Sequence, residues 1–426
     1  MHITESPSWR RRVGTGGLTA VALAAVTALG VSAAAAPVAD AQRLPGQTDC
    51  AVDYDIPQWF GKYGQYQQLL ARTPDGQMPD GVASEPDFSR DSRANKRVVF
   101  TSTATNIAGP VQPGAKNIYV VQRTGDIGAL GNAWQVGRTV LISKGTNGPA
   151  NGDSYAGSMS GFTGAADAPK GPAKLAFLSK ATNLPGGNPS GVSAYVANTD
   201  GGGIKRLKAP GTATGVGISG DSKVLYVSTT SGLYVLADGK KAKRLVKGGG
   251  IDSPSTTLNG NQAAFAQRGV VYTVTIKGKK RRIAAGTHPH ADGGEPGKKS
   301  EGKQGNVRAI TFNRGTTAWK AQLIPKFEVK QFGPKANGTT AVNGGGAAIA
   351  FGNGAGACVK VEVIVGPKTG QTGGYDIPQG GCPEGQGTVA DVSLSTRYNY
   401  VAFTCTGGGL YHYWIGDKGN DRHPVS

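Results

Sequence analysis

The sequence predicts an all-β chain built from one short unit that is repeated along its length, and three observations carry this prediction. Nearly the same eight residues occur twice, as FTSTATNI from Phe100 and as FLSKATNL from Phe177. Apolar segments of strand length recur between clusters of turn residues, with a spacing of about 40 to 50 residues. Glycine contributes 68 residues and charged residues only 17% of the chain, which favours tight turns over long helices.

The recurring apolar segments are predicted to be equivalent strands, one in each unit. Several follow a shorter strand and a turn of Ser, Asn, Asp or Gly, which makes each the second strand of its unit. The segments are RVVFTS from Arg97, KLAFLS from Lys174, KVLYVS from Lys223, QAAFAQ from Gln262, TTAWKA from Thr316, AAIAFGN from Ala347 and NYVAFTC from Asn399. They define seven units, with six as the alternative, because the fifth and sixth lack the serine that follows the aromatic residue elsewhere.

Two units are complete enough to show their remaining strands. Residues 231–248 and 269–286 each contain a third strand, a turn rich in Gly and Lys, and a fourth strand. One sheet of four antiparallel strands cannot bury both of its faces, but sheets stacked radially around an axis cover one another. We therefore predict a β-propeller of seven four-stranded blades over residues 84–426.

The repeat also carries a family resemblance. Its pattern of an apolar pair, a serine, a turn, and then AFxS and ATNL resembles the WD-like repeats of TolB-type β-propellers, which occur in many exported bacterial proteins. The resemblance runs from about Phe88 to the C-terminus. It implies the propeller fold and does not imply an activity.

Residues 1–41 are predicted to be a cleaved signal peptide. Arg10–Arg12 provide a positively charged start, an apolar stretch of small residues begins at Leu18, and Ala39-Asp40-Ala41 is an A-x-A cleavage site. A transmembrane anchor is the alternative, which the small residues and the cleavage pattern disfavour. The paired arginines leave the twin-arginine route open beside the general secretory route. We expect an exported monomer, extracellular or associated with the cell envelope, with no membrane span after cleavage.

The four cysteines that follow the signal peptide predict two disulfides, because an even number in an exported chain usually pairs. Three connectivities are possible for Cys50, Cys358, Cys382 and Cys405. Cys358 begins one predicted strand and Cys382 follows the next, so we expect these two to pair across a hairpin. Cys50 would then pair with Cys405 and tie the N-terminal segment to the last blade.

Residues 42–83 are expected to close the ring of blades. YDIPQ occurs at Tyr54 and again at Tyr375, where its position in the repeat makes it the fourth strand of unit six. If the first copy has the same role, the N-terminal segment supplies the outer strand of the last blade, beside LYHYWIG from Leu410. The C-terminal tail DRHPVS could complete that blade instead. We also predict a short helix in WFGKYGQYQQLLAR, which begins at Trp59.

The chain is strongly basic, with a formal net charge of +19, of which residues 1–41 contribute +1. In an exported protein this charge favours an anionic wall polymer or polysaccharide as the partner over nucleic acid, and no aromatic residues lie among the charges to stack on bases. The charges gather in the last turn and fourth strand of two units. Candidate binding residues are Lys240, Lys241, Lys243, Arg244, Lys279, Lys280, Arg281 and Arg282. Alternatively, these charges only protect an exposed sheet edge from pairing with another strand.

Two further groups of residues are candidates for ligand binding. THPHADGGEP from Thr287 contains His288, His290 and Asp292 in a predicted loop between blades four and five. An ordinary polar loop is the alternative, and we predict neither a metal nor another cofactor there. Asn106 and Asn183 occupy equivalent loop positions, where an asparagine can contact a ligand or close a local turn.

These observations favour a non-catalytic binding or scaffold module, whose partner is an envelope protein or an anionic polymer. The alternative is a propeller-type lyase or hydrolase that acts on polysaccharide in the central funnel near His288 and His290. The two functions differ because an enzyme needs an acid and a base that converge on one point.

Overall fold

The computed structural model describes fourteen stretches of the chain between residues 66 and 414, and residues 45–426 form one compact unit. The described residues are 66–90, 97–124, 135–161, 173–188, 191–237, 240–291, 306–324, 326–333, 339–342, 348–352, 358–364, 374–383, 385–395 and 400–414. The predicted signal peptide, Cys50, the first YDIPQ, Asp292 and the DRHPVS tail lie outside them.

The strands form seven antiparallel sheets of four strands each, as predicted, and one two-stranded hairpin. From the inner to the outer strand, blade one is β2 (Ala83–Phe88), β3 (Arg97–Ser102), β4 (Asn117–Thr124) and β5 (Gln135–Leu141), and blade two is β8 (Ser154–Met159), β9 (Lys174–Ser179), β10 (Ser193–Asn198) and β11 (Lys205–Arg206). Blade three is β12 (Ala213–Ile218), β13 (Val224–Thr229), β14 (Gly232–Ala237) and β15 (Lys243–Lys247), and blade four is β16 (Ile251–Thr256), β17 (Gln262–Gln267), β18 (Val270–Thr275) and β19 (Lys280–Ala285).

The other three blades follow the same order. Blade five is β20 (Thr287–Ala291), β21 (Ala309–Arg314), β22 (Thr317–Gln322) and β23 (Glu328–Gly333), and blade six is β24 (Ala341–Val342), β25 (Ala348–Gly352), β26 (Cys358–Ile364) and β27 (Gly374–Gly381). Blade seven is β28 (Val389–Leu394), β29 (Tyr400–Cys405), β30 (Leu410–Trp414) and β1 (Tyr66–Leu69). The hairpin is β6 (Lys144–Gly145) with β7 (Gly148–Pro149). In these ranges, no helix is long and apolar enough to cross a membrane.

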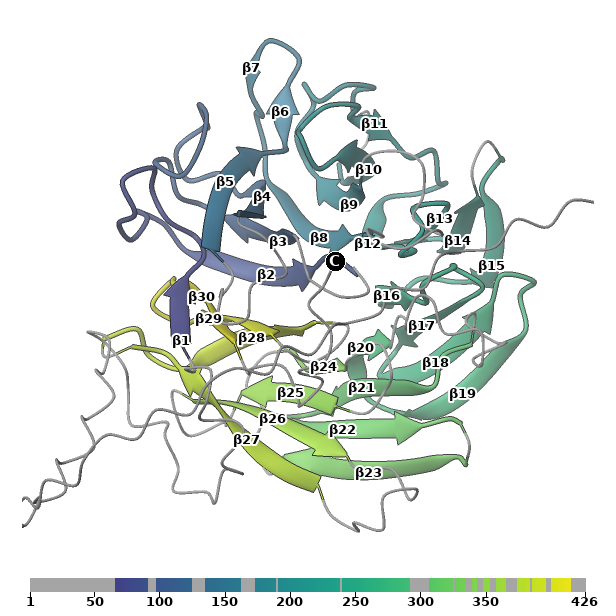
Figure 1. Ribbon diagram of the computed structural model, residues 1–426. Helices are drawn as coiled ribbons and strands as arrows, with labels where there is room; N and C mark the ends of the chain where they lie inside the picture. The colour runs from purple at the N-terminus through teal and green to yellow at the C-terminus, as the bar shows by residue number, and fades with distance from the viewer. Residues whose placement is uncertain are drawn as a thin grey trace, which may run out of the picture. The chain divides into compact units, whose positions relative to one another are not determined.

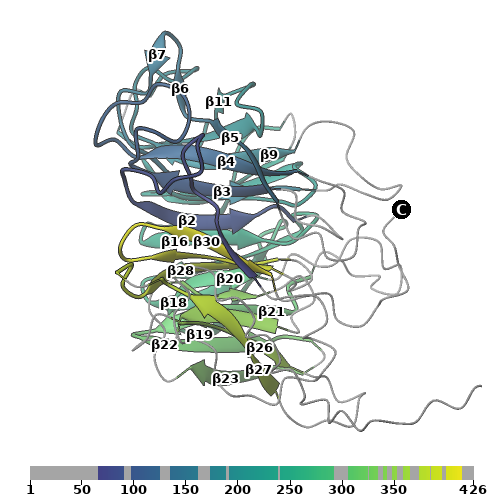
Figure 2. The ribbon, with the colours of Figure 1, turned by 60° about the vertical axis from the view of Figure 1, so that its left-hand side comes forward.

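The seven sheets stand around a common axis, with their first strands innermost. Figure 1 looks along this axis and shows β2, β8, β12, β16, β20, β24 and β28 around the centre, with the fourth strands at the periphery. Figure 2 shows the same sheets from the side, stacked one behind another. This is the β-propeller that the repeat predicts, with seven blades rather than the alternative six.

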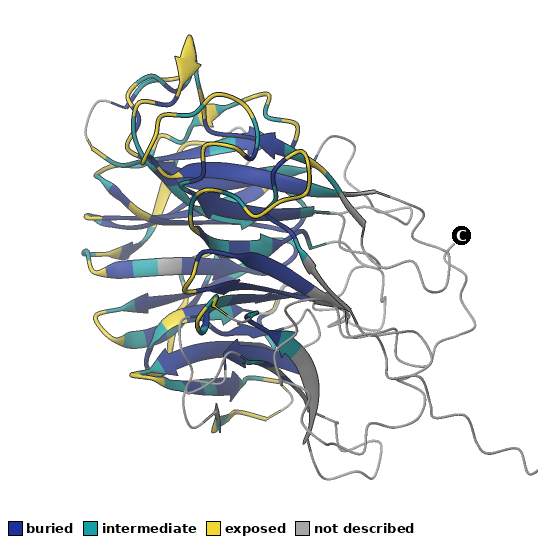
Figure 3. Ribbon diagram, turned by 90° about the vertical axis from the view of Figure 1, so that its left-hand side faces the viewer, coloured by how far each residue is buried: buried dark blue, intermediate teal, exposed yellow. Residues whose placement is uncertain are grey.

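The hydrophobic core of the described residues consists of seven separate clusters, and each lies between two neighbouring blades. The second strands are therefore almost fully buried, whereas exposed residues concentrate in fourth strands such as β15 and β19 and in the connections at the strand ends (Figure 3). Each blade covers one face of the next, and this is how a sheet of four strands buries both of its apolar faces.

The repeated octapeptide has a structural explanation in the contact between second and third strands. In four blades, a phenylalanine of the second strand is paired in register with a tyrosine of the third, and the two rings stack. The pairs are Phe100 with Tyr119, Phe177 with Tyr195, Phe265 with Tyr272 and Phe403 with Tyr411, with ring centroids 5.5, 5.5, 5.6 and 5.8 Å apart. Such cross-strand aromatic pairs stabilise a sheet beyond the burial of their area.

Blade five corrects one of the predicted second strands. TTAWKA was expected to be the second strand of its unit, but residues 317–322 are the third strand, β22. The second strand is β21, with the sequence AITFNR. Its Phe312 pairs in register with Trp319 of β22, so the aromatic residue of TTAWKA takes the place that tyrosine has in other blades.

The N-terminal segment supplies the outer strand of blade seven, but with different residues from those expected. β1 pairs with β30 from Tyr66↔Trp414 to Leu69↔Tyr411. The closing strand is therefore YQQL, whereas the second YDIPQ lies in β27, the fourth strand of blade six. The short helix predicted here is wrong for Tyr66–Leu69, which form a strand. An isolated helix this short is barely stable in water, whereas pairing with the edge of β30 gives the backbone of these residues hydrogen-bond partners in the sheet.

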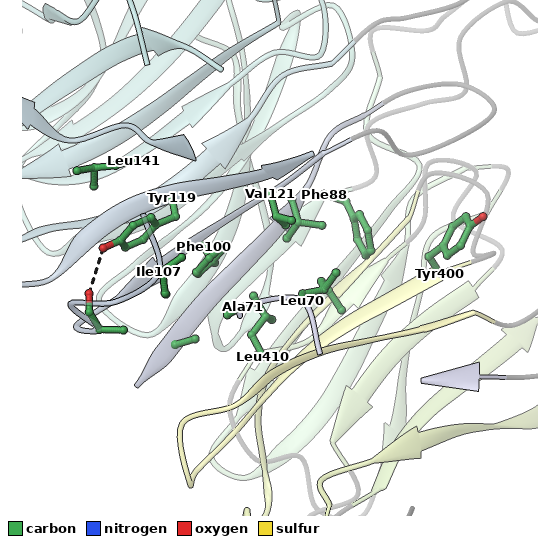
Figure 4. Packing of buried hydrophobic residues seen from close by; sticks show 14 residues of the cluster. Leu70, Ala71, Phe88, Phe100, Ile107, Tyr119, Val121, Leu141, Tyr400 and Leu410 are labelled. Atoms are coloured by element: carbon green, nitrogen blue, oxygen red, sulfur yellow. Dashed lines mark hydrogen bonds between the residues drawn. The ribbon is translucent and has the colours of Figure 1, made fainter. Parts of the chain in front are cut away.

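Closure also joins the last blade to the first through side chains. Leu70 and Ala71 follow the closing strand and are buried together with Leu410 of blade seven and with Phe88 and Phe100 of blade one (Figure 4). The backbone N–H of Leu70 donates a hydrogen bond to the carbonyl oxygen of Leu410 at 2.8 Å. The N-terminal segment is thus anchored in the interface between the two ends of the ring.

The predicted disulfide pairing is wrong, because Cys382 is bonded to Cys405 with 5.6 Å between their Cα atoms. Cys358 is also disulfide-bonded. In the hairpin of blade six, the residue opposite Cys358 is Gly381, and Cys382 is one residue further along. Successive side chains of a strand point to opposite faces of the sheet, so Cys382 points away from Cys358 and toward blade seven. The bond therefore links two blades.

We expect loss of the interblade bond to destabilise the protein. The bond closes a loop with a sequence separation of 23, and the chain-entropy relation gives about 3 kcal/mol for such a loop. Cys382→Ala, Cys405→Ala and the double variant should lower the free energy of urea unfolding by similar amounts, because each removes the same bond. Effects of the single substitutions that add in the double variant would contradict this pairing.

Candidate functional site

The inner strands enclose a central cavity of about 460 Å³. Every blade contributes lining residues, and most are polar. Figure 1 shows the inner strands converging around this axis. A position close to the axis brings side chains from blades far apart in the sequence within reach of one ligand, so the cavity is the first candidate site.

The lining depends on a bulge that recurs in the inner strands of six blades. Each bulge adds one residue, and in blades one, two and five this residue has a positive φ, with values of 53° at Glu85, 55° at Ala156 and 50° at His288. In blades one, four and five the next residue is a proline. Proline fits there because a bulge leaves one backbone N–H out of the sheet pairing.

In four of these six blades, the residue after the bulge is polar and accepts a hydrogen bond from a backbone N–H of the next blade. The acceptors and donors are Asp87 Oδ2 with Met159 N (2.7 Å), Ser158 Oγ with Ile218 N (3.3 Å), Ser255 Oγ with Ala291 N (3.1 Å) and His290 Nδ1 with Val342 N (3.3 Å). Two neighbouring positions extend the series, with Thr339 Oγ1 accepting from Val392 N (3.1 Å) and Ser393 Oγ from Phe88 N (3.1 Å). Between blades three and four, Thr214 Oγ1 donates to the carbonyl oxygen of Ile251 at 2.8 Å. We call this ring of contacts the inner girdle.

Two carboxylates near the bulges add a second set of links. Glu85 Oε2 accepts hydrogen bonds from the backbone N–H of Ala156 at 2.7 Å and from the Thr101 hydroxyl at 2.8 Å. The backbone N–H of Glu85 donates to Asp391 Oδ2 at 3.2 Å. Blades seven, one and two are therefore connected through Asp391 and Glu85, which the sequence analysis did not identify.

The predicted histidine cluster is part of this girdle and does not lie in a loop. THPHA forms β20, the inner strand of blade five, because the bulge allows the strand to accommodate Pro289. His290 is half-buried, and its Nδ1 is the girdle acceptor. His288 is exposed and lines the cavity. Asp292 lies outside the described residues, so the three predicted ligand residues are not brought together within the described part of the chain.

The titratable groups of the girdle have shifted pKa values. Burial raises the pKa of Asp87 to about 6, against the opposing effects of the Arg90 charge and the hydrogen bond from Met159. Burial lowers the pKa of His290 to about 3, and the positive charge of Arg90 adds to this shift. His290 is therefore neutral at pH 7, as its role as a hydrogen-bond acceptor requires.

Arg90 spans one end of the cavity. It follows β2 in blade one, and its Nη1 donates a hydrogen bond to the carbonyl oxygen of Thr256 at the end of β16 in blade four. Since these blades are not neighbours in the ring, the side chain crosses the axis. It places a positive charge near Asp87 and His290, which explains its effect on both pKa values.

Asn106 and Asn183 make the same contact in two blades. Asn106 Oδ1 accepts the backbone N–H of Asp80 at 3.1 Å, and Asn183 Oδ1 accepts that of Asn151 at 3.0 Å. Asp80 and Asn151 each precede the first strand of their blade, and each side chain in turn accepts the backbone N–H of the threonine that comes before Asn106 or Asn183. The recurrence of ATN is thus explained by a contact within the blade, and a ligand contact at these residues stays a prediction.

The predicted cationic residues form a second candidate site on the outer side of two neighbouring blades. Lys243 and Arg244 lie in β15, and residues 280–282 lie in β19, the fourth strands of blades three and four, as expected. All eight candidate side chains are exposed, including Lys240, Lys241 and Lys279 in the preceding turns. Within the described ranges, none of the eight forms an ion pair.

Three triplets with a central proline mark the inner girdle in the sequence, but their equivalence becomes apparent only in the structure. Glu85-Pro86-Asp87, Ser253-Pro254-Ser255 and His288-Pro289-His290 are equivalent triplets, in which a polar residue follows a proline. The inner strands contain few apolar residues, so the triplets fall outside the apolar pattern that marks the second strands. Read alone, HPH indicates a histidine cluster, whereas beside EPD and SPS it is one more copy of a structural motif.

Comparison with known proteins gives only a distant structural likeness. No protein-family model matches the chain, and no curated protein matches it. Among solved structures, the chain is similar to the beta-propeller domain of Cps50 (Swd1) from Myceliophteria thermophila, with 10% sequence identity, a TM-score of 0.48, and coverage of 80% of this chain and 98% of that chain. A likeness this distant carries no argument about function, and the propeller fold rests on the strand order described above.

We expect the two titratable girdle residues to affect stability with opposite dependences on pH. The raised pKa of Asp87 means that the folded protein binds more protons than the unfolded chain between about pH 4 and 6, so its ionisation lowers stability as pH rises. The lowered pKa of His290 means that the unfolded chain binds more protons between about pH 3 and 6.5, so His290 adds stability as pH rises.

Asp87→Asn and His290→Asn each keep a side-chain hydrogen-bond acceptor and remove one titration. Measured by urea unfolding between pH 4 and 6.5, the stability of Asp87→Asn relative to the wild type should rise with pH by about 2 kcal/mol, and that of His290→Asn should fall by about 3 kcal/mol. Parallel profiles for the two variants would contradict these assignments.

Proposed function

We propose that this protein is an exported, non-catalytic β-propeller that serves as a binding or scaffold module at the cell envelope or outside the cell. Its ligand in this proposal is an anionic polymer, held by the outer strands of blades three and four. The signal-peptide pattern of residues 1–41 and the even number of cysteines support export. The assignment to TolB-type proteins rests on the repeat pattern and stays part of the proposal.

The observation that carries this proposal is the group of eight exposed cations on β15, β19 and the turns before them. Lys and Arg on a protein surface are often balanced by nearby carboxylates, as Lys180 is by Asp153 at 3.1 Å and Lys330 by Glu328 at 3.0 Å. The eight cations have no such partner in the described ranges. Their charges are therefore available to attract a polyanion, and export gives access to the polymers of a cell wall.

The alternative function, a lyase or hydrolase that acts on polysaccharide in the central cavity, is less favoured. Its best candidate, His290, has a low pKa and already accepts a backbone hydrogen bond, so it is poorly suited to exchange protons at neutral pH. Asp87 and Glu85 are likewise occupied by backbone N–H groups.

His288 is the histidine that remains open to the cavity, and it gives the alternative a direct test. Loss of a polysaccharide-cleaving activity in His288→Ala, with stability unchanged, would favour the enzyme. Purified wild-type protein without such activity on acidic and neutral polysaccharides would favour the binding module.

The proposed polymer site predicts salt-sensitive retention on immobilised polyanions such as polyphosphate and polygalacturonate. The fourfold variant Lys243→Gln, Arg244→Gln, Arg281→Gln and Arg282→Gln should elute at roughly half the salt concentration that the wild type requires, because four attractive charges are lost. Elution salt on each resin is the measurement.

A matched control removes four exposed positive charges elsewhere, with Lys116→Gln, Arg138→Gln, Lys144→Gln and Lys223→Gln, none of which forms an ion pair within the described ranges. Its retention should stay close to that of the wild type. If both fourfold variants elute equally early, net charge alone governs retention and the site is wrong. If the outer-strand variant instead keeps its retention and self-associates in size-exclusion chromatography, the cations protect the sheet edge and have no role in binding.

A further inference from the structure

An arginine and an aromatic ring meet on the outer surface where blades four and five come together. The guanidinium carbon of Arg281, in β19, lies 4.9 Å from the ring centroid of Phe327, which precedes β23. Phe327 is 44% exposed and is one of four exposed large hydrophobic residues in the described part of the chain. We call Arg281 and Phe327 the rim pair.

The rim pair differs from the neighbouring cation of the same strand. Lys280 lies against its own sheet, with its Nζ 3.7 Å from the ring centroid of Tyr272 and donating a hydrogen bond to Gln267 Oε1 at 2.8 Å. Because successive side chains of a strand point to opposite faces, Arg281 points away from this cluster and toward blade five. Its planar guanidinium rests on Phe327 and has no ion-pair partner among the described residues.

This arrangement combines two kinds of recognition at one place. A guanidinium presents its N–H donors in a planar fork that matches a carboxylate, and stacking on an aromatic ring limits its motion before the ligand arrives. The exposed part of the phenylalanine ring offers an apolar face of the size of a sugar ring. A pyranose has one face of C–H groups that packs on such a surface, while a uronic acid carries a carboxylate at its edge.

We infer that the rim pair recognises an acidic polysaccharide of uronic acid units, with Arg281 binding the carboxylate and Phe327 packing against the sugar ring. This inference rests on the proposed function and narrows its ligand class. A polyphosphate chain offers Arg281 the same negative charge but has no ring, so Phe327 adds nothing to its binding. The two polymers therefore separate the role of the ring from the role of charge.

The test measures the binding of the full chain to soluble polygalacturonate and to polyphosphate at one ionic strength. Phe327→Ala removes the ring and leaves the net charge unchanged, and it should weaken binding to polygalacturonate about five- to tenfold while changing binding to polyphosphate less than twofold. Phe327→Trp should restore binding to polygalacturonate, because it keeps an aromatic face. Arg281→Gln should weaken binding to both polymers.

Met78→Ala is the matched control, because Met78 is apolar and 40% exposed. It lies between β1 of blade seven and β2 of blade one, whereas the rim pair lies on blades four and five. The control should leave both affinities unchanged, and thermal unfolding should show that every variant remains folded. Equal loss on both polymers in Phe327→Ala, or no loss on either, would overturn the inference. Wild-type binding to polyphosphate but not to polygalacturonate would overturn the inference and leave the proposed function standing, whereas binding to neither would remove both.

Discussion

Each sheet of this protein has two apolar faces and cannot bury them without its neighbours, and this constraint governs the rest of the structure. The core is divided into seven clusters, one at each junction between blades. An open row of blades would leave one face of the first and one of the last exposed to water. The ring must therefore close, and the strand Tyr66–Leu69 with Leu70 behind it closes blade seven against blade one. The bond between Cys382 and Cys405 reinforces the neighbouring junction.

Closure has a direct consequence at the axis. There the inner strands converge, and in four blades the residue after the bulge directs a polar side chain to the backbone of the next blade. Asp87, Ser158, Ser255 and His290 occupy equivalent positions and make equivalent bonds. Titratable residues in a central cavity suggest catalysis, yet here their hydrogen-bonding capacity is used to hold the ring together. Burial of these two side chains is the main cause of the raised pKa of Asp87 and of the lowered pKa of His290.

The polymer-binding surface that we propose lies on the outer side of blades three and four, away from the axis. The fourth strands are paired on one edge only, and in blades three and four they carry exposed cations. Charges on such an edge prevent association with other strands and can also attract a polyanion, so protection and binding are compatible uses of the same residues. The stacking of Arg281 on Phe327 gives one part of this edge a chemistry that charge alone lacks.

The sequence alone was sufficient to predict the repeat, a blade of four strands and the position of the cations on the fourth strands of blades three and four, because these features depend on local periodicity and on turn residues. It misplaced the second strand of blade five, because Trp319 of the third strand was taken for the aromatic residue that other blades have in their second strand. It also did not identify the inner girdle. Those features, and the partner of Cys382, were decided by the tertiary structure. The reason is physical: the face to which Cys382 points, the pairing of Tyr66–Leu69 with β30 and the role of His290 depend on groups from another blade. Local sequence carries little information about such neighbours.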